Sequence, residues 1–233
     1  ALKQVGYAEE GCGTGKSILI TGASGGVGHF AIQLCKSVYQ FDNVTAVCSA
    51  RNAAFVRGLG ADTVIDYTSL AALTNSTEII NGRYDVGFDL VGGDPVCLPL
   101  GSSCGCVPTA NRKAHMINEV RSVTKGSCSG GAVAGLATGA SLNDGCCGLF
   151  GGICCSMLPG CCQYKCAALC GCAPRYEWYF LPLSKHINHV GEDLTKMRAW
   201  IENGWVKPEV SLVVGIDDIE TGIARMDPSY RTF

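Results

Sequence analysis

Charged residues are scarce in this sequence, and they form no concentrated patch. Only 16% of its 233 residues are charged and the net charge is −2, which argues against a nucleic-acid partner, because protein surfaces that bind nucleic acid are strongly basic. The first fifteen residues hold no apolar signal segment, and the longest apolar run in the middle of the chain, residues 145–160, is too short to span a bilayer. We therefore expect a protein that is not secreted. Its 47% of hydrophobic residues are enough for one domain with a substantial core.

The sequence also lacks three motifs that would indicate a nucleotide-binding P-loop, a short-chain dehydrogenase or a zinc site. Residues 11–17, Gly-Cys-Gly-Thr-Gly-Lys-Ser, suggest a P-loop, but Glu10 stands where its first glycine should be, and the strand follows the glycines instead of preceding them. The Tyr-x-x-x-Lys pair of short-chain dehydrogenases occurs nowhere in the chain. No Cys-x-x-Cys pair occurs either, which argues against a zinc site.

What the sequence does contain is a cluster of glycines between a strand and a helix. Residues 17–20 form a short apolar run typical of a buried parallel strand, and residues 29–36 carry apolar side chains at helical spacing. Between the two lie Gly22, Gly25, Gly26 and Gly28. Such glycines let the backbone approach a pyrophosphate, and the helix amino end adds N–H groups and a positive dipole. This stretch predicts a dinucleotide-binding turn.

Strand and helix patterns then alternate along the chain. Further β-rich runs lie at residues 44–48, 61–67, 84–93 and 175–181, and helical patterns lie at residues 51–59, 192–205 and 217–226. Alternation with short links predicts βαβ units. The expected fold is α/β, a doubly wound parallel sheet of the Rossmann type.

Three motifs in this order resemble the cofactor domain of the medium-chain dehydrogenases/reductases. They are the glycine turn, Leu-Gly-Ala-Asp at residues 59–62, and Phe-Asp-Leu-Val-Gly-Gly at residues 88–93. The sequence is most similar to the zinc-free, quinone-oxidoreductase-like branch, which includes reticulon-interacting-protein-like members. The resemblance implies a dinucleotide-binding domain over residues 1–233, a cytoplasmic or mitochondrial enzyme, and NADPH-dependent reduction of an enone, quinone or related carbonyl compound. It also implies that the last helix covers the edge near the cofactor cleft.

The family's N-terminal catalytic domain has no counterpart in these residues, so no residue is assigned a catalytic role. We expect the isolated chain to bind cofactor without turnover. A catalytically inactive nucleotide-binding or assembly module of a larger complex is the alternative function. The expected partners are a small-molecule substrate and a second copy of the chain or a larger complex. His29, directly after the glycine turn, is interpreted as a packed or solvent-facing residue rather than an acid catalyst.

Cofactor choice is predicted from the end of the second strand, about 20 residues past the glycine turn. An NAD-specific site places an acid there, but none occurs between Val44 and Gly60. Ser49 and Arg51 can instead donate hydrogen bonds to a 2′-phosphate, which predicts NADP. Tyr67 is either a structural residue or a contact to the adenosine ribose. The candidate cofactor contacts are Ser24, Gly25, Gly26, Val27, Ser49, Arg51, Tyr67 and Val91.

The middle of the chain departs from the family pattern. Thirteen of the sixteen cysteines lie between Cys97 and Cys172, several of them as adjacent pairs. A zinc site, a disulfide framework, and a membrane contact through palmitoylated cysteines are all possible interpretations. We favour an irregular Cys/Gly-rich insertion over residues 126–172 that holds no metal. Residues 95–107 lack a clear strand, which leaves the place of the fifth strand open.

Overall fold

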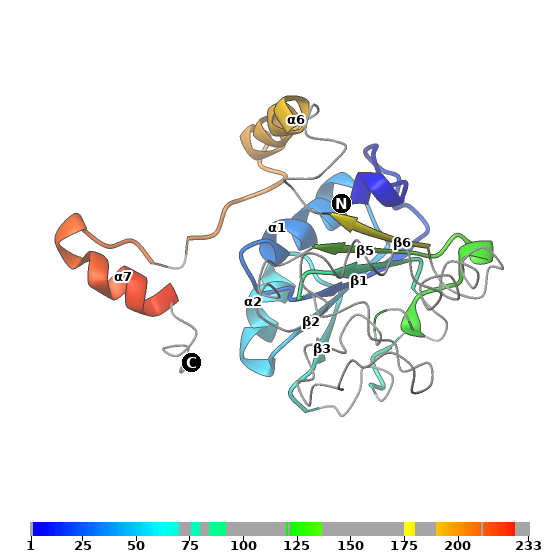
Figure 1. Cartoon of the computed structure of the whole chain (residues 1–233), viewed down its shortest axis with the longest axis horizontal. Helices are drawn as coiled ribbons and strands as arrows, with labels where there is room; N and C mark the ends of the chain where they lie inside the picture. Colours follow the sequence, from blue (N-terminus) through cyan, green and yellow to red (C-terminus); the bar gives the residue numbers. More distant parts are fainter. Residues whose placement is uncertain are drawn as a thin grey trace, which may run out of the picture.

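Six parallel strands form the centre of the molecule, in the order β3-β2-β1-β4-β5-β6 (Figure 1). The structure is a computed structural model that describes residues 2–69, 76–79, 84–91, 120, 122–136, 175–179, 190–210 and 212–226. The strands are β1 Ser17–Thr21, β2 Asn43–Cys48, β3 Thr63–Asp66, β4 Val86–Asp89, β5 Ala132–Leu136 and β6 Arg175–Tyr179. This order is that of the doubly wound Rossmann sheet, so the expected α/β fold is confirmed.

Alternate residues of the central strand feed two separate hydrophobic clusters, one on each face of the sheet. Ile18 and Ile20 belong to the cluster that packs under α1, whereas Leu19 belongs to the cluster on the opposite face. All three side chains are fully buried. On the opposite face, Val120 and Val123 cover the sheet. Because both faces are covered, β1 reads as a continuous apolar run instead of an alternating one.

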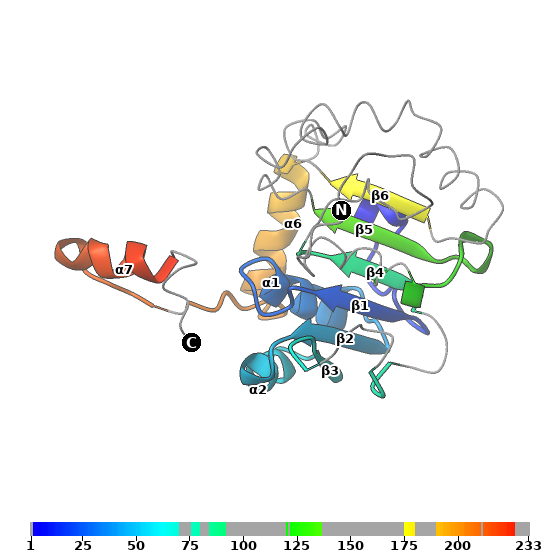
Figure 2. The same ribbon diagram turned by 60° about the horizontal axis from the view of Figure 1, so that its bottom comes forward.

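The chain reverses its direction of growth across the sheet between β1 and β4, which pair with each other although β2 and β3 come between them in sequence. Helix α1, Gly28–Gln33, follows β1 and continues as a π-helical turn, Leu34–Val38. A 3₁₀ turn, Ala50–Asn52, leads into α2, Ala53–Gly58. Figure 2 shows the arrowheads of β1, β4, β5 and β6 pointing to the same side. Ligands of such sheets bind at the carboxyl ends of the strands, at this switch point.

The glycines at residues 11–15 belong to a turn that precedes β1. The N–H groups of Gly11 and Gly13 donate to the carbonyl oxygens of Val38 and Tyr39, at 2.9 and 2.7 Å. A Cβ on Gly13 would lie 2.6 Å from the ring of Phe41. These N–H groups and this space are occupied by the fold itself, and the turn lies at the amino end of the strand. The structure therefore agrees with the rejection of a P-loop.

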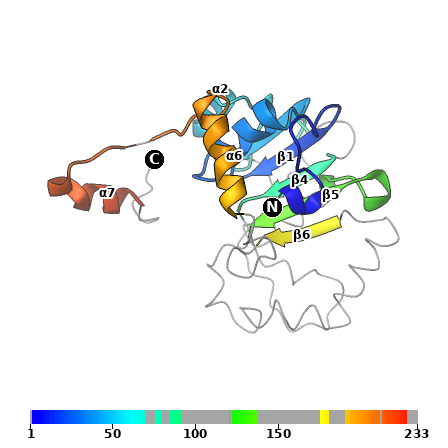
Figure 3. The same ribbon diagram turned by 90° about the horizontal axis from the view of Figure 1, so that it is seen from above.

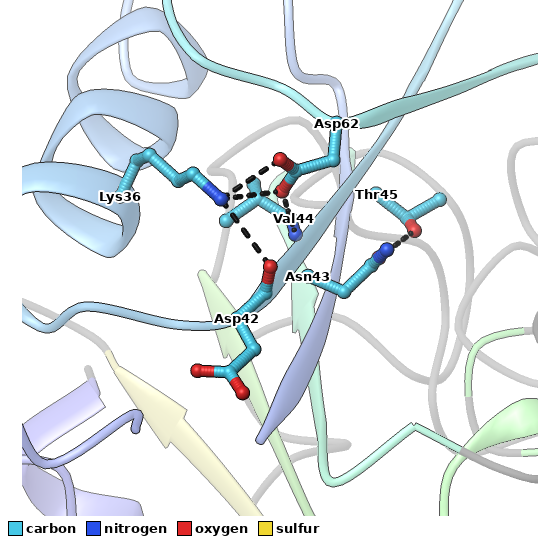
Figure 4. A network of polar contacts seen from close by, with 6 residues as sticks. All are labelled: Lys36, Asp42, Asn43, Val44, Thr45 and Asp62. Atoms are coloured by element: carbon cyan, nitrogen blue, oxygen red, sulfur yellow. Dashed lines mark hydrogen bonds and ion pairs between the residues drawn. The ribbon is translucent and has the colours of Figure 1, made fainter. Parts of the chain in front are cut away.

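The Leu-Gly-Ala-Asp motif has a structural role at the amino ends of β2 and β3 (Figure 4). Lys36 Nζ donates to both carboxylate oxygens of Asp62, at 2.8 and 2.9 Å, and to the carbonyl oxygen of Asp42, at 3.3 Å. The Asp62 carboxylate also accepts the backbone N–H of Val44 at 2.7 Å. Gly60 has a φ of +109°, which favours glycine at this turn. The motif thus ties the helix after β1 to the next two strands.

Helix α6, Val190–Glu202, is attached to the sheet domain near its carboxyl end. The indole N–H of Trp200 donates to Glu10 Oε1 at 2.9 Å, and its ring meets Tyr39 edge-on with centroids 6.4 Å apart. After the helix, the side-chain amide of Gln33 donates to the carbonyl oxygen of Lys207 at 2.9 Å and accepts its N–H at 2.7 Å. Trp200 and the residues that follow the helix therefore lie against α1 and the turn before β1.

Helix α7, Ile219–Met226, stands apart from the sheet in all three views (Figures 1, 2 and 3). A 3₁₀ turn, Ile216–Asp218, precedes it. The expectation that the last helix covers the edge near the cofactor cleft is therefore wrong. Residues 208–215 carry no helix or strand within the described part, and they lead the chain away from the sheet.

The fifth strand lies inside the range interpreted as an insertion. Ala132–Leu136 pairs with β4 on one side and with β6 on the other. Residues 95–107 and 137–174 lie outside the described residues, as do the paired cysteines. Among the helices that are described, none is long and apolar enough to cross a membrane.

Candidate cofactor-binding site

The turn after β1 depends on two glycines for its own geometry. Gly22 has a φ of +62°, a conformation that favours glycine. A Cβ on Gly28 would collide with the carbonyl oxygens of Gly22 and Ala23. The N–H of Ala23 donates to the carbonyl oxygen of Val47 at 3.3 Å, which attaches the turn to the end of β2. These two glycines therefore bring the start of α1 back over the end of β1.

Gly25, Gly26 and Val27 have a different character, because they are exposed, and Gly26 leaves space beside it. A Cβ on Gly26 would meet nothing within 4 Å among the described residues, and the Val27 side chain is 53% exposed. Within the described part of the chain, the backbone N–H groups of Gly26 and Val27 have no hydrogen-bond partner. Two such donors at the amino end of a continuous helical segment, residues 28–38, suit a phosphate. The fold does not require a glycine at residue 26, but a closely approaching anion would.

A buried pair of polar side chains joins the carboxyl ends of β1 and β4. Thr21 Oγ1 donates to Asp89 Oδ1 at 2.5 Å, and both residues are fully buried. Thr21 Oγ1 also accepts the N–H of Leu90 at 3.2 Å, and Asp89 Oδ1 accepts the N–H of Val91 at 3.2 Å. Val91 Cγ2 lies 3.3 Å from where a Cβ of Gly22 would be. The structure thus brings Val91, a predicted site residue, over the glycine turn.

Comparison with known proteins identifies relatives that match part of the chain. The chain is 53% identical over 87 residues to the chloroplast envelope quinone oxidoreductase homolog of Arabidopsis thaliana, which covers 36% of this chain and 25% of that protein. It is 45% identical over 78 residues to the chloroplastic NADPH-dependent alkenal/one oxidoreductase of the same organism, or 34% of this chain and 19% of that protein. Other relatives are named as mitochondrial NAD(P)H oxidoreductases. No protein-family model matches the chain.

Solved structures show the same fold. The quinone oxidoreductase from Coxiella burnetii superimposes with a TM-score of 0.56 at 20% identity, over 97% of this chain and 51% of that one. The chain is therefore similar to quinone and alkenal/one oxidoreductases over the matched residues, and its fold is that of the solved quinone oxidoreductase. It spans about half the length of that solved structure, and its matches span at most a quarter of the two named relatives.

Two predicted site residues meet through a third residue that the sequence did not single out. Asn52 Nδ2 lies 3.0 Å from Ser24 Oγ and 3.4 Å from Ser49 Oγ. All three residues are half-buried. Asn52 was missed because an asparagine before a helix is ordinarily a helix cap, and a contact across 28 residues leaves no signal in the sequence.

Arg51 and Tyr67 lie at the exposed ends of β2 and β3. Both side chains face solvent in part, and the N–H of Tyr67 donates to the carbonyl oxygen of Cys48 at 3.3 Å. An acid does lie nearby, namely Asp66, at the end of β3. Hydrogen bonds from Thr68 and from the backbone of Ala50 lower the pKa of Asp66, so it stays ionised. The sequence of β2 does not reveal this acid, because it comes from the neighbouring strand.

His29 is packed, in agreement with one of its two interpretations. It is buried, its Nδ1 lies 3.4 Å from the carbonyl oxygen of Gly25, and its ring centroid lies 4.1 Å from that of Phe30. Burial raises the pKa of Cys48 to about 11, so its thiol is not a nucleophile at neutral pH. Among the described residues, no three His, Cys, Asp or Glu side chains gather as metal ligands.

Proposed function

We propose that the glycine turn binds NADPH, and that the whole protein uses it to reduce a quinone, an enone or a related carbonyl compound. The observation that carries the proposal is the pair of N–H groups at Gly26 and Val27, at the switch point of the sheet, which are exposed and find no partner among the described residues. Two relatives at 53% and 45% identity are named as a quinone oxidoreductase homolog and an NADPH-dependent alkenal/one oxidoreductase, which supports the cofactor and the substrate class.

The described residues fit this cofactor at several points. The N–H groups of Gly26 and Val27 and the hydroxyl of Ser24 would bind the pyrophosphate, beside the exposed backbone of Gly25 and Gly26, and Val91 would line the turn. Ser49 and Arg51 would bind the 2′-phosphate, and Tyr67 would lie beside the adenosine ribose. Bound NADPH would supply the hydride, and the chain would supply its placement and the exclusion of water.

The first experiment fills the space beside Gly26. We expect Gly26→Ala to fold normally, because the added Cβ meets nothing and the residue is not in a left-handed conformation. Its affinity for NADPH and for NADH should fall about ten- to a hundredfold, the equivalent of one lost charged hydrogen bond. Calorimetry with both cofactors is the measurement. The matched control is Gly58→Ala, which also adds a Cβ to open space, but at the far end of α2. Equal binding by Gly26→Ala and the unmutated chain would contradict the proposal.

The second experiment concerns the choice between NADPH and NADH. Arg51 can donate two hydrogen bonds to phosphate oxygens. We expect the unmutated chain to prefer NADPH about ten- to a hundredfold. Arg51→Ala should lose most of that preference while NADH affinity changes less than about twofold. Arg57→Ala, another exposed arginine on the same helical segment, is the control. Equal affinity of the unmutated chain for both cofactors would exclude a 2′-phosphate site at Ser49 and Arg51.

Turnover separates the proposed enzyme from the alternative, an inactive nucleotide-binding or assembly module. The apolar side chains exposed on α6 and around α7 favour an assembly partner. We expect these 233 residues alone to bind NADPH without oxidising it, because hydride transfer also requires substrate held against the nicotinamide. Steady NADPH oxidation by the purified chain with a small quinone would contradict this expectation. The alternative function is supported if a longer natural protein that includes these residues binds NADPH yet reduces no quinone or enone.

The remaining features of the proposal are coarser. The substrate is a small molecule. The protein associates with a second copy of itself or belongs to a larger complex. The protein lies in an organelle or in the cytoplasm, since the names of its relatives place them in the chloroplast envelope and in mitochondria. The dinucleotide-binding domain extends over residues 1–233, with a Cys/Gly-rich insertion that binds no metal and begins after β5.

A further inference from the structure

Asn52 occupies the amino end of α2 but does not cap it. An asparagine at this position ordinarily accepts a hydrogen bond from an N–H in the first turn of its helix. Here the side chain makes no such bond. Its nitrogen instead lies 3.0 Å from the hydroxyl oxygen of Ser24 and 3.4 Å from that of Ser49. The side chain has therefore been turned away from its own helix and toward the glycine turn.

The chemistry of the three groups fixes the direction of these contacts. The carboxamide nitrogen carries two hydrogens and can only donate, so both serine oxygens accept from it. Each hydroxyl then keeps its own hydrogen for another acceptor. Asn52 is further held in place because its backbone N–H donates to the carbonyl oxygen of Ser49 at 2.9 Å. Both serines are thereby prepared as donors, one beside the pyrophosphate turn and one at the end of β2.

We propose that Asn52 is a positioning residue that orients the hydroxyls of Ser24 and Ser49 as donors to the two phosphate positions of a 2′-phosphorylated adenine dinucleotide. This inference rests on the proposed function. Asn52 itself does not touch the cofactor. It couples two subsites that lie on different strands, so its loss should weaken 2′-phosphate binding more than binding of the unphosphorylated cofactor.

The discriminating substitution is Asn52→Asp. Asp is as favourable as Asn at the start of a helix, so a purely structural role predicts unchanged folding and only the loss of phosphate binding that the added charge itself causes. The positioning role predicts otherwise, because a carboxylate only accepts and would draw both serine hydrogens toward itself. We expect the melting temperature to be maintained while affinity for NADPH and for adenosine 2′,5′-bisphosphate falls at least about thirtyfold. Affinity for adenosine 5′-monophosphate should fall less.

A double-mutant cycle removes the effect of the added charge. Calorimetry would compare Asn52→Ala in the natural background and in a Ser24→Ala/Ser49→Ala background. We expect about a tenfold loss of NADPH affinity in the first and less than about twofold in the second, because Asn52 acts only through the two hydroxyls. Equal losses in both backgrounds, or full binding by Asn52→Asp, would overturn the inference and leave the proposed function standing. If the unmutated chain binds none of the three ligands, the proposed function fails and the inference fails with it.

Discussion

The β1–α2 part of the chain and the segment from α6 to α7 both carry strong apolar patterns, yet they use them differently. In the first, the apolar side chains of β1, α1 and β2 are almost all buried, including Ile20, Ile32 and Val44. In the second, Val206 is the single buried apolar side chain among the described residues. The exposed ones there are Leu194, Ile201, Trp205, Val210, Leu212, Val213, Ile216, Ile219 and Ile223.

The difference shows that the periodic spacing of apolar residues predicts a helix or a strand, but does not predict which part of the protein buries its apolar face. A strand that is apolar on both faces finds its neighbours within one βαβ unit, because the next strand and the intervening helix are close in sequence. An amphipathic helix near the end of the chain has no such local partner. The patterns at residues 192–205 and 217–226 correctly predict helices, but only α6 gains a partial cover, through Trp200 and the residues after it.

Among single substitutions, the largest expected effect on stability would come from Gly28 in the first region. In Gly28→Ala the new Cβ collides with two backbone carbonyl oxygens, which cannot move without opening the glycine turn. We expect the free energy of unfolding to fall by about 3 kcal/mol, at the upper end for an overpacked core site. Urea denaturation measures it, with Gly58→Ala as a control that meets open space. A loss below about 0.5 kcal/mol would show that the turn relaxes freely.

Local sequence determines this first region, and for that reason it could be predicted. The glycine turn, β1 to β4, and the absence of a P-loop follow from spacing within stretches of a few residues. The role of Asp62 does not follow in this way, because its partners Lys36 and Val44 come from two other elements, although its motif resembles that of the family. The same limit hid Asn52, whose side chain reaches back to the turn after β1.

Strand β5 illustrates a second limit. Its residues, Ala-Val-Ala-Gly-Leu, have little of the β-branched character that marks a strand, and they stand next to a Cys/Gly-rich stretch. The strand exists because it fills the gap between β4 and β6. The space between β4 and β5 is also tight, because a Cβ added to Gly87 on β4 would lie 3.2 Å from the Val133 side chain. Small side chains on β5 fit this space. Burial on both faces thus decides the element, and burial is not visible in five residues.

The second largest effect would test how firmly α6 is attached. Trp200→Ala removes the ring that meets Tyr39 and the hydrogen bond to Glu10. Because the side chain is only half-buried, we expect a loss of about 2 kcal/mol in the free energy of unfolding, below the range of a fully buried tryptophan. The control is Trp205→Ala, whose side chain is exposed and should change stability little. Equal effects of the two substitutions would mean that α6 is not anchored through Trp200.

A smaller, pH-dependent effect concerns Asp85, which joins the two halves of the sheet. Its carboxylate accepts from Ser17 at 2.9 and 3.0 Å and from Lys125 at 2.6 Å. Burial acts to raise the pKa of Asp85, but the hydrogen bonds from Lys125 and Ser17 outweigh it and hold that pKa below its usual value.

A lowered pKa in the folded state means that this carboxylate stabilises the protein above its unfolded pKa of about 3.9, and that the contribution is lost as the pH falls through the folded value. We expect Asp85→Asn to lose about 1 kcal/mol at pH 7 and to show a smaller further loss than the unmutated chain between pH 5 and pH 2. Denaturation at a series of pH values compares the two. Parallel curves would show that Asp85 titrates alike in both states.

The smallest expected effect on stability lies at α7, where the contrast between the two regions is sharpest. Ile219 and Ile223 are 53% and 56% exposed, so replacing both by serine removes little buried area. We expect the free energy of unfolding of the Ile219→Ser/Ile223→Ser variant to change by less than about 0.5 kcal/mol, as for ordinary surface positions. The matched change inside the first region, Ile18→Ser/Ile20→Ser, should prevent folding, because both side chains are fully buried and each hydroxyl would lie in an apolar core. A loss of 2 kcal/mol or more at α7 would mean that these isoleucines are covered in solution. Light scattering on the same samples would then show whether a second copy of the chain provides that cover.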